Sequence, residues 1–307
     1  MKILFMGTPE IAAQCLKAIL DSKAHEVCGV YTREDKPVGR RQVMTPPPVK
    51  QLALEYGVPV YQPRTLRDGA AAEQIRALAP EIIVVVAYGR ILPQEILDIP
   101  RLGAVNLHVS LLPKYRGAAP VQWSVINGDR ETGVTIMQLD AGLDTGDILK
   151  VARVSIGEDE TSGELFERVT QVGARTLLEA LEELAQGRAV RTPQDHTQAT
   201  LAPPLSKEMA LFSFERDAAS LHNLIRGLNP WPVAYFMYDG KKIKVRASRL
   251  APGRAARPGE ILSVKPLTVA CGEGALTLLE VVPEGSRPME GSAWAAGRRF
   301  CIGDNLT

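Results

Sequence analysis

Long apolar runs and paired cysteines are both missing from this sequence. No apolar segment approaches the roughly 20 residues that a helix needs to cross a bilayer, and the N-terminus resembles a core strand more than a signal peptide, so we expect a cytoplasmic protein. The four cysteines, Cys15, Cys28, Cys271 and Cys301, form no Cys-x-x-Cys pair and have no histidine at zinc-ligand spacing. They are expected to be buried thiols in a reducing compartment, and no metal site is predicted.

The glycine-rich dinucleotide fingerprint is also missing, although the chain opens like a nucleotide-binding fold. Residues 2–7 are apolar, residues 9–20 have helical spacing with Pro9 at their start, and residues 27–32 are strand-like. This β-α-β opening predicts a doubly wound α/β sheet. The turn after the first strand reads Gly7-Thr-Pro-Glu-Ile-Ala12, and its lack of further glycines argues against bound NAD.

The later pattern predicts two domains. The first, residues 1–188, contains further helices at 49–56 and 69–78, strands at 58–61, 82–87, 132–139 and 148–156, and a long helix that is capped by residues 158–162. Residues 189–206 are polar and proline-containing, and are predicted to be a linker. A helix at 218–228 and short strands at 234–238, 242–247, 259–264, 268–270, 276–282 and 295–300 predict a small OB-like β-barrel in residues 207–307. The expected fold is α/β, with a Rossmann-like N-terminal domain.

The small total charge hides a difference between these domains. The formal net charge is only +1, but residues 207–307 carry 14 Lys and Arg against 10 Asp and Glu, which leaves a net charge of −3 for residues 1–206. A run without an intervening acidic residue contains Lys241, Lys242, Lys244, Arg246, Arg249, Arg254 and Arg257. Such a run suits a phosphate backbone, although a solvated strand face explains it equally well.

A second basic segment lies in the first domain. Residues 33–48 have no periodicity, contain Pro37 and Gly39, and end in three consecutive prolines. We therefore expect an exposed loop that is longer than a compact domain needs. From Arg33 to Lys50 there are five basic residues against two acidic ones, and a loop of this composition could fold only on binding.

One stretch concentrates polar side chains where the pattern predicts a buried strand. Asn106, His108 and Ser110 alternate with apolar residues, so an amide, an imidazole and a hydroxyl share one face. Histidine can move protons near neutral pH, and an amide can donate a hydrogen bond to a developing oxyanion, which suits acyl-type transfer. Taken alone, Asn106 and His108 could instead satisfy backbone groups at the end of a strand.

The wider sequence resembles the family of formyltransferases that use 10-formyltetrahydrofolate. Residues 106–117, Asn-x-His-x-Ser-Leu-Leu-Pro-x-Tyr-Arg-Gly, match its signature, and Asp140-Ala-Gly-Leu-Asp144-Thr-Gly-Asp-Ile148 resembles its second element. Gly7-Thr-Pro9, Val86-Ala-Tyr-Gly89, Gly133-Val-Thr-Ile-Met137 and Asn229-Pro-Trp-Pro232 extend the resemblance over essentially the whole chain. It is strongest to the members that formylate methionyl-initiator tRNA, which carry a second domain that the purine-pathway relatives lack.

The resemblance implies the residues of the site. Asn106, His108 and Asp144 would be catalytic, with Asp144 orienting the imidazole. The folate co-substrate would bind at Val86, Tyr88, Gly89, Ser110, Leu111, Leu112, Pro113 and Asp140, with Ser110 supporting its loop and not reacting. Initiator methionyl-tRNA would contact Arg33, Lys36, Arg40 and Arg41 in the first domain, and Lys241, Lys242, Lys244 and Arg246 in the second. No obligate protein partner and no membrane contact are expected.

Three alternatives remain open at this point. The same catalytic domain could formylate another amine, such as an amino sugar or glycinamide ribonucleotide, although the basic C-terminal domain argues against this. It could hydrolyse the folate, if water occupied the place of the acceptor amine. The chain could also be a non-enzymatic RNA-binding protein, which the intact Asn106, His108 and Asp144 argue against. The sequence departs from the family pattern at Arg41-Gln-Val43 and around Leu211–Phe214.

Overall fold

The structure is a computed structural model that describes residues 1–39, 41–253 and 255–307. Arg40 and Arg254, which belong to the two basic segments, lie outside the described residues. The chain forms two compact units, one from residues 1–117, 133–154 and 168–201 and the other from residues 118–132, 155–167 and 202–307. Two early segments thus belong to the same unit as the C-terminal residues, and the domain boundaries at residues 188 and 206 stay a prediction.

The first unit is organised around a seven-stranded sheet. Its strands are β1 (Lys2–Gly7), β2 (Glu26–Tyr31), β5 (Val60–Tyr61), β6 (Ile82–Val86), β7 (Ala104–His108), β9 (Glu131–Gln138) and β10 (Ile148–Ser155). Their order is β10-β9-β7-β6-β1-β2-β5, and β7 pairs parallel with β6 but antiparallel with β9. All five residues of β6 are buried, as its β-branched sequence predicts for a central parallel strand.

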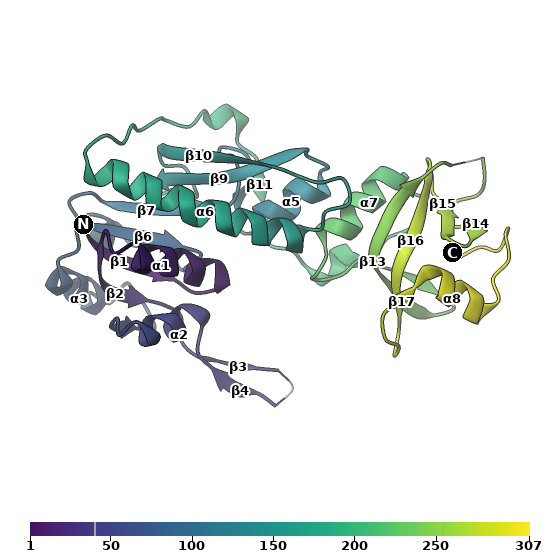
Figure 1. The fold of residues 1–307 in the computed structure, drawn as a ribbon, viewed down its shortest axis with the longest axis horizontal. Coiled ribbons are helices and arrows are strands. Elements are labelled where there is room, and N and C mark those ends of the chain that lie inside the picture. The colour runs from purple at the N-terminus through teal and green to yellow at the C-terminus, as the bar shows by residue number, and fades with distance from the viewer. Residues whose placement is uncertain (40, 254) are drawn as a thin grey trace. The chain divides into compact units, whose positions relative to one another are not determined.

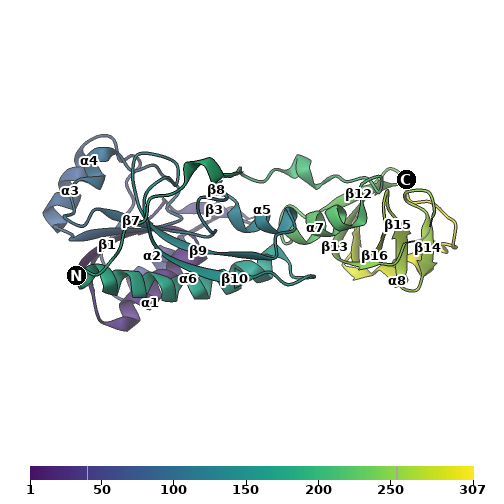
Figure 2. The same ribbon diagram turned by 90° about the horizontal axis from the view of Figure 1, so that it is seen from above.

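Helices cover both faces of this sheet. They are α1 (Glu10–Ser22), α2 (Pro48–Glu55), α3 (Ala70–Leu78), α4 (Gln94–Leu97) and α6 (Ser162–Ala185). Figure 2 shows α1 and α6 on one side of the sheet and α3 and α4 on the other, so the predicted doubly wound, Rossmann-like sheet is confirmed. Within the described residues, no helix is both long and apolar enough to cross a membrane.

The basic segment at residues 33–48 is not the unstructured loop that we expected. It contains a hairpin of β3 (Lys36–Val38) and β4 (Val43–Thr45), visible in Figure 1 below α2. The turn places Gly39 at a φ of 72° and Gln42 at a φ of 49°, in the left-handed region that glycine adopts freely. Because each strand has only three residues, their alternation is too short to distinguish from a loop in the sequence.

The second unit contains an antiparallel sheet of strands β12 to β17. The strands are β12 (Tyr235–Tyr238), β13 (Lys241–Ala251), β14 (Ile261–Val264), β15 (Leu267–Ala270), β16 (Ala275–Pro283) and β17 (Met289–Glu290). Their order is β12-β13-β16-β15-β14, and β17 pairs with β16; Figure 1 shows β13 and β16 as long neighbouring strands. The helices are α5 (Pro120–Ile126), α7 (Ala218–Gly227) and α8 (Gly291–Arg298). A small β-rich C-terminal domain is therefore confirmed.

Aromatic rings fill the core of this second unit. The rings of Phe212, Phe214 and Phe236 lie 5.0 to 5.7 Å apart between centroids. The altered segment Leu211–Phe214 thus supplies two buried core side chains, while Leu211 itself is exposed. The two phenylalanines of this segment therefore serve the packing of the core.

The strand predicted at residues 295–300 is wrong, because α8 occupies most of this segment. Alanine is the best helix former, and the sequence Ser-Ala-Trp-Ala-Ala favours a helix once one side of it can be buried. Trp294 is 5% exposed, and its ring packs edge-on against Phe236 and Phe300. An added Cβ at Gly291 would lie 2.0 Å from the carbonyl oxygen of Leu278, so glycine lets this helix begin against β16.

The cysteines are buried only in part. Cys15 and Cys271 are buried, Cys28 is half-buried and Cys301 is exposed. Burial raises the pKa of both the Cys15 thiol and the Cys271 thiol to about 12. The expectation of buried thiols is therefore wrong for Cys301.

Candidate functional site

Two polar side chains lie at the carboxyl end of β7. Asn106 and His108 alternate with Leu107, whose side chain lies where α6 approaches the sheet at Gly173. Strand β7 pairs with β6 in the register Val85↔Asn106, so both strands end at the same edge of the sheet. Open α/β sheets bind ligands at this edge.

Both nitrogens of the His108 imidazole face protein oxygens. The side chain is buried, and Nε2 lies 2.8 Å from the carbonyl oxygen of Tyr115. Because a carbonyl can only accept, Nε2 carries a hydrogen. Nδ1 lies 3.7 Å from Oδ2 of Asp144, which is an ion-pair distance and too long for a hydrogen bond. The structure therefore brings His108 and Asp144 together.

The loop that carries Asp144 is fixed at several points. Asp144 has a φ of 52°, in the left-handed region, and its Oδ2 accepts a hydrogen bond of 2.9 Å from the backbone N–H of Gly117. The Asp140 carboxylate accepts a hydrogen bond of 2.7 Å from the Thr145 hydroxyl. An added Cβ at Gly146 would lie 1.8 Å from a backbone oxygen, so this position requires glycine. Asp140 thus closes the loop, while Asp144 faces His108.

The loop after β7 is held by side chains of its own and of β9. The Ser110 hydroxyl donates to the carbonyl of Lys114 at 2.7 Å, as expected for a supporting role. From β9, the Thr135 hydroxyl donates to the carbonyl of Ser110 and accepts from the backbone N–H of Leu112. An added Cβ at Gly133 would lie 2.5 Å from a methyl carbon of Leu111. The Gly133-Val-Thr135 motif therefore shapes this loop.

The remaining folate candidates differ in exposure. Gly89 and Asp140 are exposed, Leu111 and Pro113 are partly exposed, and Val86, Tyr88 and Leu112 are buried. The buried side chains among these candidates can shape the walls of a ligand site more readily than they can contact the whole surface of a bound ligand. No group of three or more His, Cys, Asp or Glu side chains that could hold a metal ion occurs in the described part of the chain.

The turn that follows β6 is held by two polar side chains. The Thr8 hydroxyl donates to the carbonyl of Tyr88 at 3.1 Å, and Nη1 of Arg33 donates to the carbonyl of Gly89 at 2.8 Å. Gly89 has a φ of 77°. The Tyr88 hydroxyl is buried without a hydrogen-bond partner among the described residues, and burial raises its pKa. A polar group of a bound ligand would satisfy this hydroxyl.

The tRNA candidates of the first unit do not form one cluster. Lys36 and Arg41 are exposed on the hairpin of β3 and β4. Arg33 is instead tied to Gly89, so the structure places it with the folate candidates. Arg40 lies outside the described residues.

The tRNA candidates of the second unit lie on one strand. On β13, Lys242, Lys244 and Arg246 alternate with two buried apolar residues, and Lys241 is exposed at the strand's start. The Lys242 ammonium lies 4.8 Å from the centroid of the Tyr235 ring. Arg246 pairs with Glu280 at 2.8 Å, so the three lysines carry more of the uncompensated positive charge of this strand than the arginine does.

Two residues near Asp144 escaped the sequence reasoning. Gln194 is 6% exposed and Arg116 is 8% exposed, and Nη2 of Arg116 donates to Oε1 of Gln194 at 2.6 Å. Arg116 belongs to the matched signature, so its position was a usable signal. Gln194 lies in the predicted linker, where nothing in the local pattern distinguishes it from a solvated polar residue.

Comparisons with known proteins show the family to which the chain belongs. Residues 1–181 match the formyl transferase family, and residues 204–299 match the formyl transferase C-terminal domain. The methionyl-tRNA formyltransferase of Ectopseudomonas mendocina is 48% identical over 97% of this chain and 95% of its own length, and that of Geobacter sulfurreducens is 45% identical over 100% and 96%. The structure of the methionyl-tRNA formyltransferase from Clostridium thermocellum superposes with a TM-score of 0.57 at 20% identity, covering 83% of this chain and 95% of its own.

Proposed function

Because the chain belongs to the methionyl-tRNA formyltransferase family, we propose that it transfers the formyl group of 10-formyltetrahydrofolate to the amino group of methionine on initiator tRNA. The product is N-formylmethionyl-tRNA for translation initiation, and the reaction takes place in the cytoplasm. The observation that carries the proposal is that His108 Nδ1 lies 3.7 Å from the Asp144 carboxylate. His108 follows Asn106 by two residues, so both side chains lie on the same face of β7.

The proposed chemistry is a direct transfer without an enzyme-bound intermediate. The neutral amine of methionine attacks the formyl carbon, which forms the new carbon–nitrogen bond and a tetrahedral oxyanion. The Asn106 amide and the protonated His108 stabilise this oxyanion, a contribution of about 100- to 1000-fold per donor in comparable sites. The bond between the formyl carbon and the folate nitrogen then breaks. The proton that leaves the amine ends on that nitrogen, and Asp144 helps to carry it directly or through water.

The folate co-substrate is proposed to bind along the strand ends that surround these three residues. In the turn after β6, Tyr88 supplies its buried hydroxyl and Gly89 supplies an exposed stretch of backbone. The loops at residues 110–113 and 140–144 supply the opposite walls, with Asp140 exposed for contact. The hydrogen bond from Arg33 to the Gly89 carbonyl supports a positioning role for this arginine in the same site.

Two basic surfaces are proposed to bind the tRNA. One is the hairpin with Lys36 and Arg41, to which the sequence adds Arg40. The other is β13, on which Lys242, Lys244 and Arg246 share one face and Lys241 is exposed at the start of the strand. Lys242, Lys244 and Arg246 suit binding to phosphates, because they project from one face at even spacing.

The test is formyl transfer from 10-formyltetrahydrofolate to charged initiator tRNA, run beside charged elongator methionine tRNA and free methionine. We expect a strong preference for the initiator. Folate turnover without that preference would keep the chemistry of Asn106, His108 and Asp144 but require another acceptor amine. No turnover with any of the three acceptors would overturn the proposed function.

A further inference from the structure

Gln194 is a buried residue that contacts the loop of Asp144 at two points. Its side chain is 6% exposed, and Nε2 donates to the carbonyl of Asp144 at 2.9 Å and to the carbonyl of Gly146 at 2.8 Å. The two carbonyls flank Thr145, so one amide spans the second half of the loop. Both hydrogens of the amide nitrogen are therefore used to hold the backbone on which the Asp144 carboxylate depends.

The orientation of this amide is fixed by its third partner. Nη2 of Arg116 lies 2.6 Å from Oε1 of Gln194 and 2.9 Å from Nδ1 of His196. A guanidinium can only donate hydrogen bonds, so the Gln194 atom that faces it must be the oxygen. The amide nitrogen consequently faces the two carbonyls, and a reversed amide would leave all three contacts without a donor and acceptor in the right places.

These contacts close a ring around Asp144. Gly117, the neighbour of Arg116, donates its backbone N–H to the Asp144 carboxylate at 2.9 Å, while Arg116 reaches the Asp144 carbonyl through Gln194. The same loop places the Tyr115 carbonyl on Nε2 of His108. Both members of the His108–Asp144 pair are thus held by residues 115–117.

Residues 192–202 fasten this loop in turn. The short strands β8 (Arg116–Gly117) and β11 (Leu201–Ala202) form a two-stranded sheet. The backbone N–H of Arg116 donates to the carbonyl of Thr200 at 2.8 Å, and the backbone N–H of Tyr115 donates to the hydroxyl of Thr200 at 2.9 Å. The segment that resembled a linker in the sequence therefore braces both loops of the candidate site.

We propose that Gln194 is a positioning residue for Asp144. It holds the Asp144 backbone in its left-handed conformation, so that the carboxylate faces His108 Nδ1. Without the two amide hydrogen bonds, the loop can rotate the carboxylate away while the fold and both substrate surfaces remain. This inference rests on the proposed role of Asp144 in formyl transfer.

The experiment compares Gln194→Met and Gln194→Glu with Gln198→Met. The methionine variant keeps the length of the side chain but loses its polar atoms. The glutamate variant keeps an oxygen for Arg116 but loses both donors to the loop, so it tests the proposal if the methionine variant fails to fold. Gln198 is the matched control, because it lies in the same segment, is exposed, and its amide nitrogen donates to Asp195 and not to the loop of Asp144.

We expect either Gln194 variant to lower kcat roughly 10- to 100-fold, the scale of a misplaced catalytic group, with KM for the folate and for the tRNA within about twofold of wild type. Gln198→Met should match wild type. Each Gln194 variant is also made in an Asp144→Ala background and assayed under single turnover, where we expect no further loss of rate.

Two results would overturn the proposal. One is a kcat within about twofold of wild type for a folded Gln194 variant. The other is an equal loss from the Gln194 change in both backgrounds, which indicates a general structural role. If the Asp144→Ala protein has no detectable activity, the kcat and KM values of the single Gln194 variants decide. A large rise in KM with unchanged kcat then contradicts positioning of Asp144. Failure of the wild-type chain to formylate tRNA would instead count against the proposed function.

Discussion

Two regions of this molecule contain a buried histidine beside an aspartate, and they are built for different purposes. In the first unit, Nδ1 of His108 lies 3.7 Å from Asp144. In the second unit, Nε2 of His222 lies 3.4 Å from Asp159. Residue types and distances are nearly the same, so the difference must come from the other partners of each pair.

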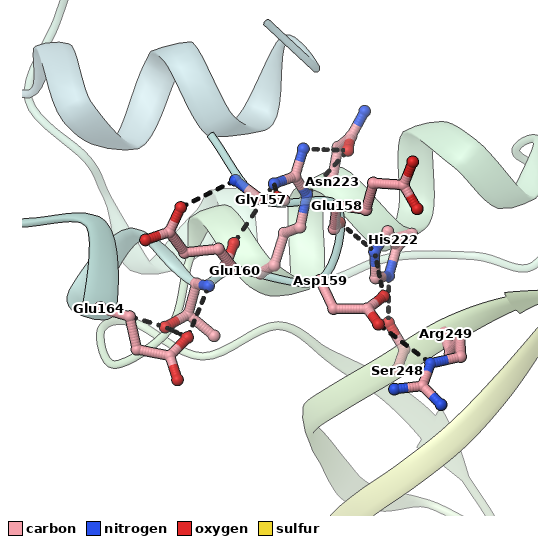
Figure 3. A network of polar contacts seen from close by, with 11 residues as sticks. Gly157, Glu158, Asp159, Glu160, Glu164, His222, Asn223, Ser248 and Arg249 are labelled. Carbon is pink, nitrogen blue, oxygen red and sulfur yellow. Dashed lines mark hydrogen bonds and ion pairs between the residues drawn. The ribbon is translucent and has the colours of Figure 1, made fainter. Parts of the chain in front are cut away.

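The His222 pair is enclosed in a joint between segments of the second unit. His222, on α7, shares its Nδ1 with the Ser248 hydroxyl of β13 at 3.0 Å, and its Nε2 lies 3.0 Å from the carbonyl of Glu158. Figure 3 shows these partners converging from three segments, with Arg249 on the far side of Asp159. Both nitrogens of the ring are committed, so the histidine joins α7 to Glu158 and Asp159 on one side and to β13 on the other.

The His108 pair is committed on one side only. Its Nε2 is held by a backbone carbonyl, while Nδ1 and Asp144 face each other beyond hydrogen-bond distance. Asn106 lies two residues before His108 on the same face of β7. The Asp144 backbone is held in a left-handed conformation, which costs a non-glycine residue of order 1 kcal/mol or more. A buried histidine and carboxylate thus indicate chemistry only where part of the network is left for a substrate at a ligand-binding edge.

The largest expected effect separates the two histidines by turnover. Replacing Asn106, His108 or Asp144 by alanine should lower the rate of formyl transfer by about 100- to 1000-fold, because oxyanion stabilisation or proton transfer is lost. Affinity for the tRNA should remain nearly that of wild type, since none of these side chains lies on the proposed basic surfaces. Steady-state kinetics with a filter-binding assay checks both. A His108→Ala protein with wild-type turnover would show that the mechanism is wrong.

The converse change should act on stability. His222→Ala removes two hydrogen bonds and leaves the buried Ser248 hydroxyl and the Glu158 carbonyl without this partner, which should cost about 2 to 3 kcal/mol of unfolding free energy. The three tryptophans, Trp123, Trp231 and Trp294, all lie in the second unit, so their fluorescence during urea unfolding reports it. Turnover per folded molecule should not change. His25→Ala, at a half-buried histidine, is the control.

Removing the lysines of β13 should affect tRNA binding only. Replacing Lys241, Lys242 and Lys244 by alanine should weaken binding about tenfold at low salt and flatten the plot of log affinity against log salt by about one unit for each phosphate that the variant no longer binds. Turnover at saturating tRNA should stay near wild type. Lys265→Ala, an exposed lysine between β14 and β15, should leave the slope unchanged. An unaltered slope in the triple variant would remove this face from the proposed interface.

The smallest expected effect is the contribution of His222 to the pH dependence of stability. Burial lowers the pKa of His222 below its ordinary value of 6.5. Above pH 6.5 the His222 side chain is neutral in both the folded and the unfolded protein. As the pH falls below 6.5, the unfolded chain binds a proton that the folded one refuses, so stability falls, by at most about 1.4 kcal/mol per pH unit for one group.

A comparison with His222→Gln isolates this contribution. The variant should lose less stability than wild type between pH 6.5 and the lowered folded pKa, since glutamine does not titrate. His25, whose pKa burial also lowers, is present in both proteins and cancels. Urea unfolding at several pH values measures the difference, and parallel curves for the two proteins would contradict the assignment.

The sequence by itself determined the catalytic candidates and the class of the fold. Alternation along residues 104–110 placed Asn106 and His108 on one face, and the β-branched run at residues 82–86 predicted a central strand, because local backbone geometry fixes which side chains share a face. The link to Asp144, 36 residues after His108, came only from the resemblance. No periodicity connects two loops that meet in space.

Only the tertiary structure decided the parts that depend on contacts far apart in the chain. Gln194 resembles any polar linker residue until its amide is seen against the carbonyls of Asp144 and Gly146. Residues 291–298 became a helix because Trp294 could be buried against Phe236 and Tyr238, which are distant in the sequence. The two histidine–aspartate pairs differ for the same reason: the partners that separate a catalytic pair from a structural joint arrive from other segments, and burial with hydrogen bonding, not local sequence, selects them.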